Sequence, residues 1–150
     1  MRYLAIDLGD RRTGLAVGDA IIGSVSPAGV VEIPIAEHDG KALLKALERA
    51  IDEHLGSGEL VIGVPLNMDG TAGPRAKAVR AFAARLAERT KRVIHEQDER
   101  LTSVDADWAM SQSGLTHAQK KRKRDALAAA AILRDFLATL GNNQPQPNDE

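Results

Sequence analysis

The chain contains no cysteine and few aromatic residues: one tryptophan, one tyrosine and two phenylalanines among 150 residues. Without cysteine it forms no disulfide, has no thiolate nucleophile and cannot build a zinc ribbon. A chain without disulfides suits a reducing compartment, so we expect a cytoplasmic protein. Its four histidines have no metal-ligand spacing, and no Ser-His-Asp set is evident.

Long hydrophobic runs and an excess of one charge are also missing. The longest apolar run, Ala126 to Leu133, is far shorter than the about 20 residues of a membrane-spanning helix. The N-terminus lacks the pattern of a secretory signal, and we expect no membrane partner. The formal net charge is −1, so a site for a polyanion has to come from local clustering of cations.

Hydrophobic periodicity predicts three consecutive strands, followed by helices that alternate with strands. The expected strands are residues 2–8, 13–19, 23–34, 59–65 and 91–97, and the expected helices are residues 40–55, 74–90, 101–114 and 125–140. This order predicts an α/β fold with a mixed five-stranded sheet, a three-stranded antiparallel meander followed by two parallel strands, and helices on both faces. The order is typical of ribonuclease H-like folds, and also of actin-like and sugar-kinase ATPase lobes. We expect one domain in residues 1–140 and a disordered polar tail in residues 141–150.

Asp7 stands inside the apolar first strand, immediately before Leu8 and Gly9. A buried ionised carboxylate costs free energy unless a cation or a hydrogen-bond donor meets it. Strand alternation points Asp7 to the same face as Tyr3 and Ala5. Asp7 is either the cap of a hairpin turn or a functional group beside a glycine that lets a phosphate approach the backbone. Its place inside the apolar run favours the functional interpretation.

A first polar loop, GVPLNMDGTAGP, follows the fourth expected strand. A turn at Asp69-Gly70, with Pro74 at the first position of a helix, explains this composition well. The loop also lies at the carboxyl edge of the sheet, where α/β proteins commonly bind ligands. Asn67, Asp69 and Thr71 are therefore equally candidates for a binding site.

A second polar loop, QDERLTS, follows the fifth expected strand. Adjacent charges of this kind usually form a solvated loop. Alternation aims only one of Asp98 and Glu99 at the face that Asp7 uses, which leaves the other for a different role. The spacing does not decide which of the two acids faces Asp7.

The last expected helix, residues 125–140, opens with an acid. On a helical wheel Asp125 lies with Ala129, Ile132 and Phe136 on the apolar stripe, so its carboxylate is aimed inward. A favourable interaction with the helix dipole would also explain an acid in the first turn. Five consecutive cations, residues 120–124, precede this helix and oppose its dipole. Either a solvated loop or a patch for a phosphate backbone would account for these cations.

Four motifs together resemble the YqgF family in residues, order and spacing: DLGDRRTGLAVGD, GVPLNMDGT, DERLTS and DALAAAAIL. The likeness extends from about residue 2 to residue 140. The family comprises bacterial ribonuclease H-like proteins described as pre-16S rRNA nucleases and as Holliday junction resolvases. The resemblance implies a metal-dependent endonuclease that processes the 5′ end of pre-16S rRNA in ribosome biogenesis, or alternatively a Holliday junction resolvase acting on branched DNA.

Carried over residue by residue, the acidic positions of the family are Asp7, Glu99 and Asp125. The resemblance implies that these acids are catalytic and hold Mg²⁺ or Mn²⁺, with Asp98 as a further metal ligand. Three carboxylates within about 5 Å repel one another by roughly 3 kcal/mol per pair at an effective dielectric near 20, and a divalent cation relieves this repulsion. Many such enzymes carry a second helical acid three residues further on, where this chain has Ala128.

The residues expected to bind substrate belong to the same motifs or to the basic run: Gly9, Arg11, Arg12, Asn67, Asp69, Gly70, Thr71, Arg100, Thr102, Lys120, Lys121, Arg122, Lys123 and Arg124. The expected partner is nucleic acid, either an rRNA precursor, free or on the ribosome, or branched DNA. We expect a monomer or a weak homodimer. Two other classes compete: a phosphate-binding ATPase lobe, for which 150 residues leave no room for the second lobe, and a non-catalytic nucleic-acid-binding factor.

Overall fold

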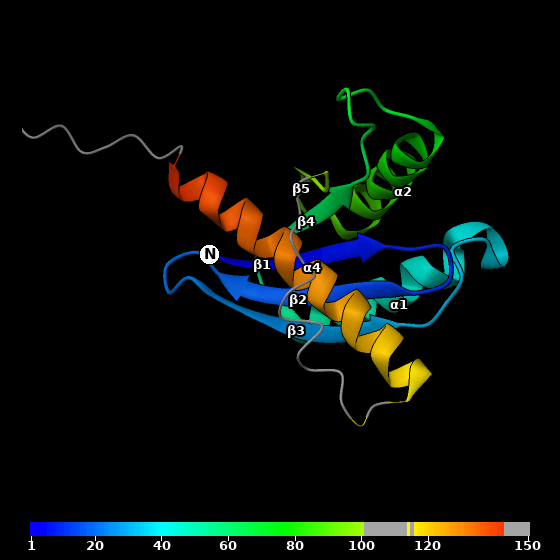
Figure 1. The fold of residues 1–150 in the computed structure, drawn as a ribbon, viewed down its shortest axis with the longest axis horizontal. Helices are drawn as coiled ribbons and strands as arrows, with labels where there is room; N and C mark the ends of the chain where they lie inside the picture. Colours follow the sequence, from blue (N-terminus) through cyan, green and yellow to red (C-terminus); the bar gives the residue numbers. More distant parts are fainter. Residues whose placement is uncertain (101–113, 115, 143–150) are drawn as a thin grey trace, which may run out of the picture.

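The computed structural model describes residues 1–100, 114 and 116–142. Its centre is a five-stranded sheet with the strand order β3-β2-β1-β4-β5 (Figure 1). The strands are β1 (Arg2–Leu8), β2 (Thr13–Asp19), β3 (Ser24–Val31), β4 (Glu59–Val64) and β5 (Ile94–Asp98). The first three strands are antiparallel neighbours, while β4 runs parallel to β1 and β5 parallel to β4. The predicted mixed sheet is therefore confirmed.

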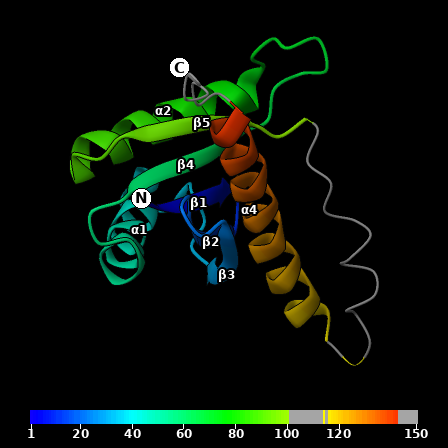
Figure 2. The same ribbon diagram turned by 90° about the vertical axis from the view of Figure 1, so that its left-hand side faces the viewer.

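Helices cover both faces of this sheet, as predicted (Figure 2). A short 3-10 helix, η1 (Glu37–Gly40), leads into α1 (Lys41–His54), and α1 packs with α2 (Pro74–Thr90) on one face. The long helix α4 (His117–Asn142) covers the other face. Within these described ranges, no helix combines the length and the apolar character that crossing a lipid bilayer requires.

The β1 strand is buried between these two helical layers. Leu4 and Ile6 pack toward α1 and α2, whereas Tyr3 and Ala5 pack toward α4. Alternation therefore places Asp7 on the α4 face of the sheet, at the carboxyl end of β1. The expected side for Asp7 is confirmed.

The last helix begins earlier than the sequence predicted. It starts at His117 and not at residue 125, so the cations of residues 120–124 lie inside its first two turns. The reason is a capping box: Gln119 N donates to Thr116 Oγ1 at 3.2 Å, and Thr116 N donates to Gln119 Oε1 at 3.0 Å. The stretch THAQ was the signal for this start. Asp125 consequently lies in the third turn, where a dipole partner has little effect. The predicted helix 101–114 lies outside the described residues.

A close contact at Gly14 sets how α4 lies on the sheet. A Cβ atom at Gly14 would overlap the backbone carbonyl of Asp125. Gly14 is also the cross-strand partner of Asp7 in β2. Since Ala129 and Ala130 are fully buried against the same face, small residues on both surfaces bring the α4 backbone down beside the end of β1.

We expect Gly14→Ala to lower the free energy of unfolding by about 1–3 kcal/mol, because the added methyl group has no space beneath α4. The control is Gly141→Ala, at a position with no neighbour within 4 Å of an added Cβ. There the helix propensity of alanine should leave the stability equal or slightly higher. Denaturant unfolding of the three proteins measures this, and equal stability of wild type and Gly14→Ala would contradict it.

Candidate active site

Two carboxyl groups from different strands meet over the middle of the sheet. Asp7 is the penultimate residue of β1, and Glu99 directly follows β5, two strands away in the sheet. The two side chains share a hydrogen bond. The contact depends on Gly63 in the intervening strand β4, because a Cβ atom there would overlap the Glu99 carboxyl group. The Glu99 backbone is fixed as well, since its N–H donates to Val64 O at 3.2 Å.

Burial controls the protonation of this pair. Desolvation, followed by the charge of Asp7, raises the pKa of Glu99 to about 8. Desolvation also raises the pKa of Asp7, although the hydrogen bond from Glu99 acts in the opposite direction. At neutral pH Glu99 therefore holds a proton and donates it to the Asp7 carboxylate.

Asp125 is the third acid of this region, and an arginine holds it. The Arg12 Nε atom donates to Asp125 Oδ2 at 2.8 Å, and the two side chains are 32% and 27% exposed. The Asp125 charge reaches Asp7 and contributes to raising its pKa. Among the residues that the structure describes, no three His, Asp or Glu side chains are grouped to hold one metal ion. Asp125 thus lies beside the Asp7–Glu99 pair, with its carboxylate paired to Arg12.

The donor chemistry nevertheless fits a hard divalent cation. Asp7, Glu99 and Asp125 offer only oxygen ligands, as Mg²⁺ and Mn²⁺ prefer. In the metal-free site, the proton shared by Asp7 and Glu99 reduces the repulsion between the two carboxyl groups. A bound divalent cation would reduce this repulsion in place of the proton. Asp7 and Glu99 already meet, and Asp125 would complete a set of three ligands only by leaving Arg12.

Asp98 has a different set of partners. Its Oδ1 accepts from the Arg100 backbone N–H at 2.9 Å, and its Oδ2 accepts from Arg100 Nε at 2.7 Å. These bonds lower the pKa of Asp98. Within the described residues no hydrogen bond joins Asp98 to Asp7. The structure thus brings Glu99 to Asp7, and the role of Asp98 as a further metal ligand stays a prediction.

Arg100 connects the two loops at this edge of the sheet. Besides binding Asp98, its guanidinium donates to Met68 O at 3.0 Å. The first loop is held internally by Asn67, Asp69 and Thr71: Thr71 Oγ1 donates to Asp69 Oδ1 at 2.6 Å and accepts from Asn67 Nδ2 at 3.1 Å. The polar side chains of this loop therefore bond to one another in the structure. Their predicted contacts with substrate stay a prediction, and Thr102 lies outside the described residues.

Arg75 is a residue of this region that the sequence analysis missed. It lies in the first turn of α2, where its guanidinium donates to Leu8 O at 3.4 Å and approaches Asp10 Oδ1 at 3.5 Å. Its charge lowers the pKa values of both Asp7 and Glu99. The signal was its position directly after Pro74, because a helix that starts at the carboxyl edge points its first turn at the site.

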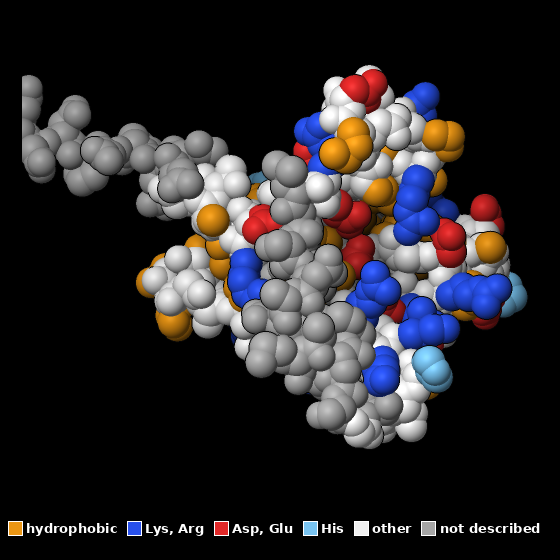
Figure 3. Space-filling model, viewed as in Figure 1, with side chains coloured by type: hydrophobic (Ala, Val, Ile, Leu, Met, Phe, Trp, Pro, Cys, Tyr) orange, Lys and Arg blue, Asp and Glu red, His pale blue; other side chains and the backbone are white. Residues whose placement is uncertain are grey.

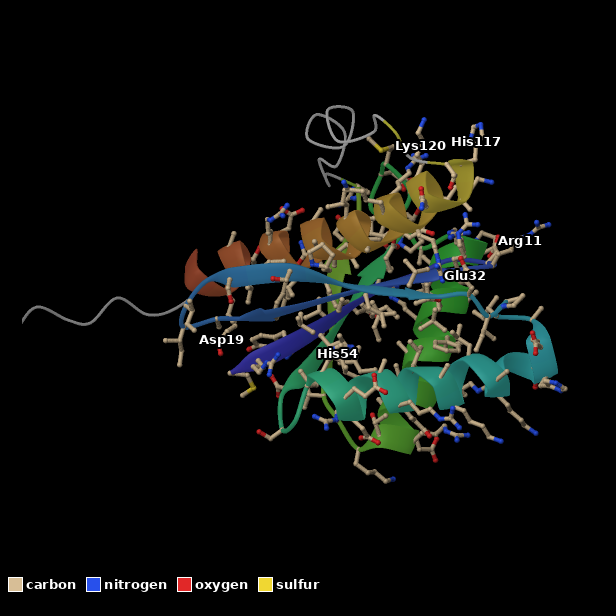
Figure 4. The ribbon with its side chains drawn as sticks, turned by 90° about the horizontal axis from the view of Figure 1, so that it is seen from below. Arg11, Asp19, Glu32, His54, His117 and Lys120 are labelled. Atoms are coloured by element: carbon tan, nitrogen blue, oxygen red, sulfur yellow. The ribbon has the colours of Figure 1, made fainter. Side chains whose placement is uncertain are left out.

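An open depression of about 650 Å³ is lined in part by Arg12, the residue that binds Asp125. Its lining includes Arg11, Arg12 and Glu32. Gly9 tightens the β1–β2 loop that carries the two arginines, since a Cβ atom there would overlap the Arg12 carbonyl. Figure 4 shows Arg11 and Glu32 at the same end of the molecule as the start of α4. Of the residues of this loop that were predicted to bind substrate, Arg12 contacts one of the three acids, Asp125, and the substrate roles stay a prediction.

The basic run of α4 divides into two groups. Arg122 Nε pairs with Glu32 Oε1 at 2.8 Å, which ties the helix to the segment after β3. Lys120 points away from the sheet (Figure 4), and Lys121, Lys123 and Arg124 are exposed. In the space-filling view, acidic side chains lie near the middle of this face, with several cations next to them (Figure 3). Polyanion binding and carboxylate chemistry can therefore occur on one surface.

Comparisons with known proteins agree with this arrangement. A family described as "RuvX: Holliday junction resolvase" matches residues 1–139. A protein of Opitutus terrae is 41% identical over 91% of this chain and 91% of its own length, and one of Anaeromyxobacter sp. is 36% identical over 91% and 96%. Both are named "Putative pre-16S rRNA nuclease". Thermus thermophilus RuvC bound to a Holliday junction substrate superposes with a TM-score of 0.52 at 17% identity, covering 94% of this chain and 96% of its own. The fold is thus ribonuclease H-like, as predicted.

Proposed function

Because this chain belongs to the RuvX (YqgF) family of nucleases, we propose that it is a divalent-metal-dependent endonuclease that hydrolyses phosphodiester bonds of nucleic acid. The observation that carries this proposal is the Asp7–Glu99 carboxyl pair at the carboxyl edge of the sheet. A half-buried pair of acids that shares a proton is poorly explained as a turn cap. A metal-binding site in its metal-free state explains the pair well.

Asp7, Glu99 and Asp125 would hold the ion, which we propose is Mg²⁺ or Mn²⁺. When bound, the ion supplies a Lewis acid that polarises the scissile phosphate and makes a water molecule more acidic. Asp7 and Glu99 orient the site from two strands whose backbones are fixed in the sheet. A carboxylate oxygen of this pair would accept the proton that the attacking water loses.

Cations around the acids would neutralise the substrate. Arg75 is close enough for its charge to affect both carboxyl groups, and its hydrogen bonds to other described residues are long, at 3.4 and 3.5 Å. It can therefore turn its donors toward a phosphate oxygen. Arg11 lines the adjoining depression, and Lys120, Lys121, Lys123 and Arg124 extend the positive surface along α4. Ala128 stands where some related enzymes carry a fourth acid, so the ligands here number three unless Asp98 or Asp10 contributes.

The substrate that we propose is the 5′ end of pre-16S rRNA, since that is the substrate named for relatives that match along most of the chain. The second candidate is a Holliday junction, the substrate named in the family description. The reaction would take place in the cytoplasm, on free or ribosome-bound precursor, with the protein as a monomer or a weak homodimer.

The test is a parallel cleavage assay on a ribosome-bound rRNA precursor and on a four-way DNA junction, each with Mg²⁺, with Mn²⁺ and with EDTA. Cleavage of the precursor only with a metal ion supports the first candidate. Cleavage of the junction alone supports the second. Binding to either substrate without cleavage under every condition would identify a non-catalytic binding factor and overturn the proposed activity.

We expect replacement of Lys120, Lys121 and Lys123 with glutamine to weaken nucleic-acid binding and to reduce the slope of log affinity against log salt by about 2–3, because three phosphate contacts are lost. The fold should be unaffected, since these lysines lie outside the packed cores. The control replaces Lys41, Lys45 and Lys77, on the helices of the opposite face, with glutamine. Fluorescence anisotropy across a salt series provides the slopes, and the same slope in both triple variants would contradict the prediction.

A further inference from the structure

The ion pair between Arg12 and Asp125 joins the two halves of the candidate site. The pair connects the β1–β2 loop to α4 across 113 positions of sequence, with 2.8 Å between Nε and Oδ2. Asp125 borders the Asp7–Glu99 pair, while Arg12 also lines the depression. One arginine therefore contacts an acid of the candidate site and also lines the depression.

We propose that Arg12 exchanges partners during the reaction cycle: it holds Asp125 while the metal site is empty, and it is released to a substrate phosphate when a divalent cation takes Asp125. The inference rests on the proposed function, because it concerns the same metal and the same substrate.

Competition for one carboxylate is the physical reason. Arg12 occupies Asp125 Oδ2, and a divalent cation bound to that oxygen would repel the guanidinium, so the ion and Arg12 compete for it. The pair is about a third exposed, so its strength is moderate and a divalent ion can displace it.

Once displaced from Asp125, the Arg12 side chain is available to bind a substrate phosphate. The two acidic side chains that line the depression already have partners, since Glu32 pairs with Arg122 and Asp10 lies 3.5 Å from Arg75. A released Arg12 therefore finds no open carboxylate among these lining residues, and its five donors suit a phosphate. Metal binding and phosphate binding would be coupled through this side chain, and each would favour the other.

The first test measures Mn²⁺ binding alone by calorimetry. Arg12→Gln should bind Mn²⁺ about two- to fivefold more tightly than wild type, because the ion no longer displaces an arginine. The control is Arg80→Gln, which removes an equal charge from a surface pair with Glu96 at 3.0 Å and should leave Mn²⁺ affinity unchanged. Wild type that binds no Mn²⁺ would overturn the proposed function together with this inference. Wild type that binds Mn²⁺ with an affinity equal to that of Arg12→Gln would overturn the inference alone.

The second test measures the affinity for a cleavage-resistant phosphorothioate oligonucleotide, with Mn²⁺ and with EDTA. Arg12→Gln should lose affinity several-fold with Mn²⁺ and little with EDTA, since in EDTA the wild-type Arg12 is still held by Asp125. An equal loss under both conditions would make Arg12 a permanent substrate contact and overturn the exchange.

A double-mutant cycle in EDTA gives an independent readout. Asp125→Asn frees Arg12 without a metal, so this variant should bind the oligonucleotide more tightly than wild type and more tightly than Asp135→Asn, an equal charge change further along α4. Adding Arg12→Gln to Asp125→Asn should remove the gain. A gain that survives the second substitution would show that Arg12 does not carry it and would overturn the proposal. Thermal melts of each variant confirm that it folds.

Discussion

Asp7→Asn is expected to abolish cleavage without destabilising the protein. Asp7 interacts with two other acids and is half-buried, so neutralising it removes a partly desolvated charge while its amide oxygen can still accept from Glu99. In EDTA this variant should unfold at the same temperature as wild type or higher. It should gain less from added Mg²⁺ or Mn²⁺, and its cleavage rate should fall about a thousandfold, which corresponds to about 4 kcal/mol of lost transition-state stabilisation.

Thermal melts with and without metal, run beside cleavage assays, decide this prediction. Asp7→Ala tests whether the hydrogen bond matters apart from charge, and Asp52→Asn on α1 provides an exposed acid as the control. A turn cap would behave in the opposite way, with a loss of about 0.5–2 kcal/mol on removal. Metal-independent destabilisation of Asp7→Asn with full cleavage would show that Asp7 is structural.

Glu99→Gln is expected to abolish cleavage, again by about a thousandfold, whereas Asp98→Asn should reduce it by about ten- to a hundredfold. Glu99 is the acid that reaches Asp7, and Asp98 acts through Arg100, which holds the adjoining loops. Glutamine has the shape to fill the space over Gly63 and can donate to Asp7, so the variant should fold. Equal losses of cleavage in the two variants would mean that the role of metal ligand belongs to Asp98 or is shared by Asp98 and Glu99.

The pH dependence of stability gives a second readout of Glu99. In EDTA the folded protein keeps the Glu99 proton from its usual pKa of 4.5 up to about 8, while the unfolded chain has lost it. The folded state thus binds more protons in this window, and the free energy of unfolding should fall as the pH rises through it. Glu99→Gln should flatten this slope. Chemical denaturation at a series of pH values measures it, and parallel slopes would show that the proton is held elsewhere.

The sequence predicted the sheet well because each strand carries its own signal. β1 and β4 are nearly continuous apolar runs, and the turn residues between elements stand out. The position of Asp7 on the α4 face followed from alternation alone. The helix start at His117 was missed because apolar residues do not recur at helical spacing in the stretch before Asp125. The capping-box residues Thr116 and Gln119 were nevertheless visible in the sequence.

The choice between Asp98 and Glu99 could not be read from spacing. Both acids lie at the end of a strand, where alternation becomes uncertain by one residue. The family resemblance selected Glu99, and the space over Gly63 gives the physical reason. Arg75 and the Arg12–Asp125 pair could not be found from the sequence either, because each depends on a contact between segments far apart in the chain.

The position of α4 after all five strands has a consequence for biosynthesis. A nascent chain emerges from its N-terminus, so the sheet is complete before the helix that carries Asp125 leaves the ribosome. Until then Tyr3, Ala5 and Val61 lie on an uncovered sheet face, and the acid pair lacks its third member. The unfinished protein therefore exposes an apolar sheet face and lacks one acid of the proposed site. If Asp125 is needed for cleavage, the synthesis of α4 covers the sheet and completes the site in one step.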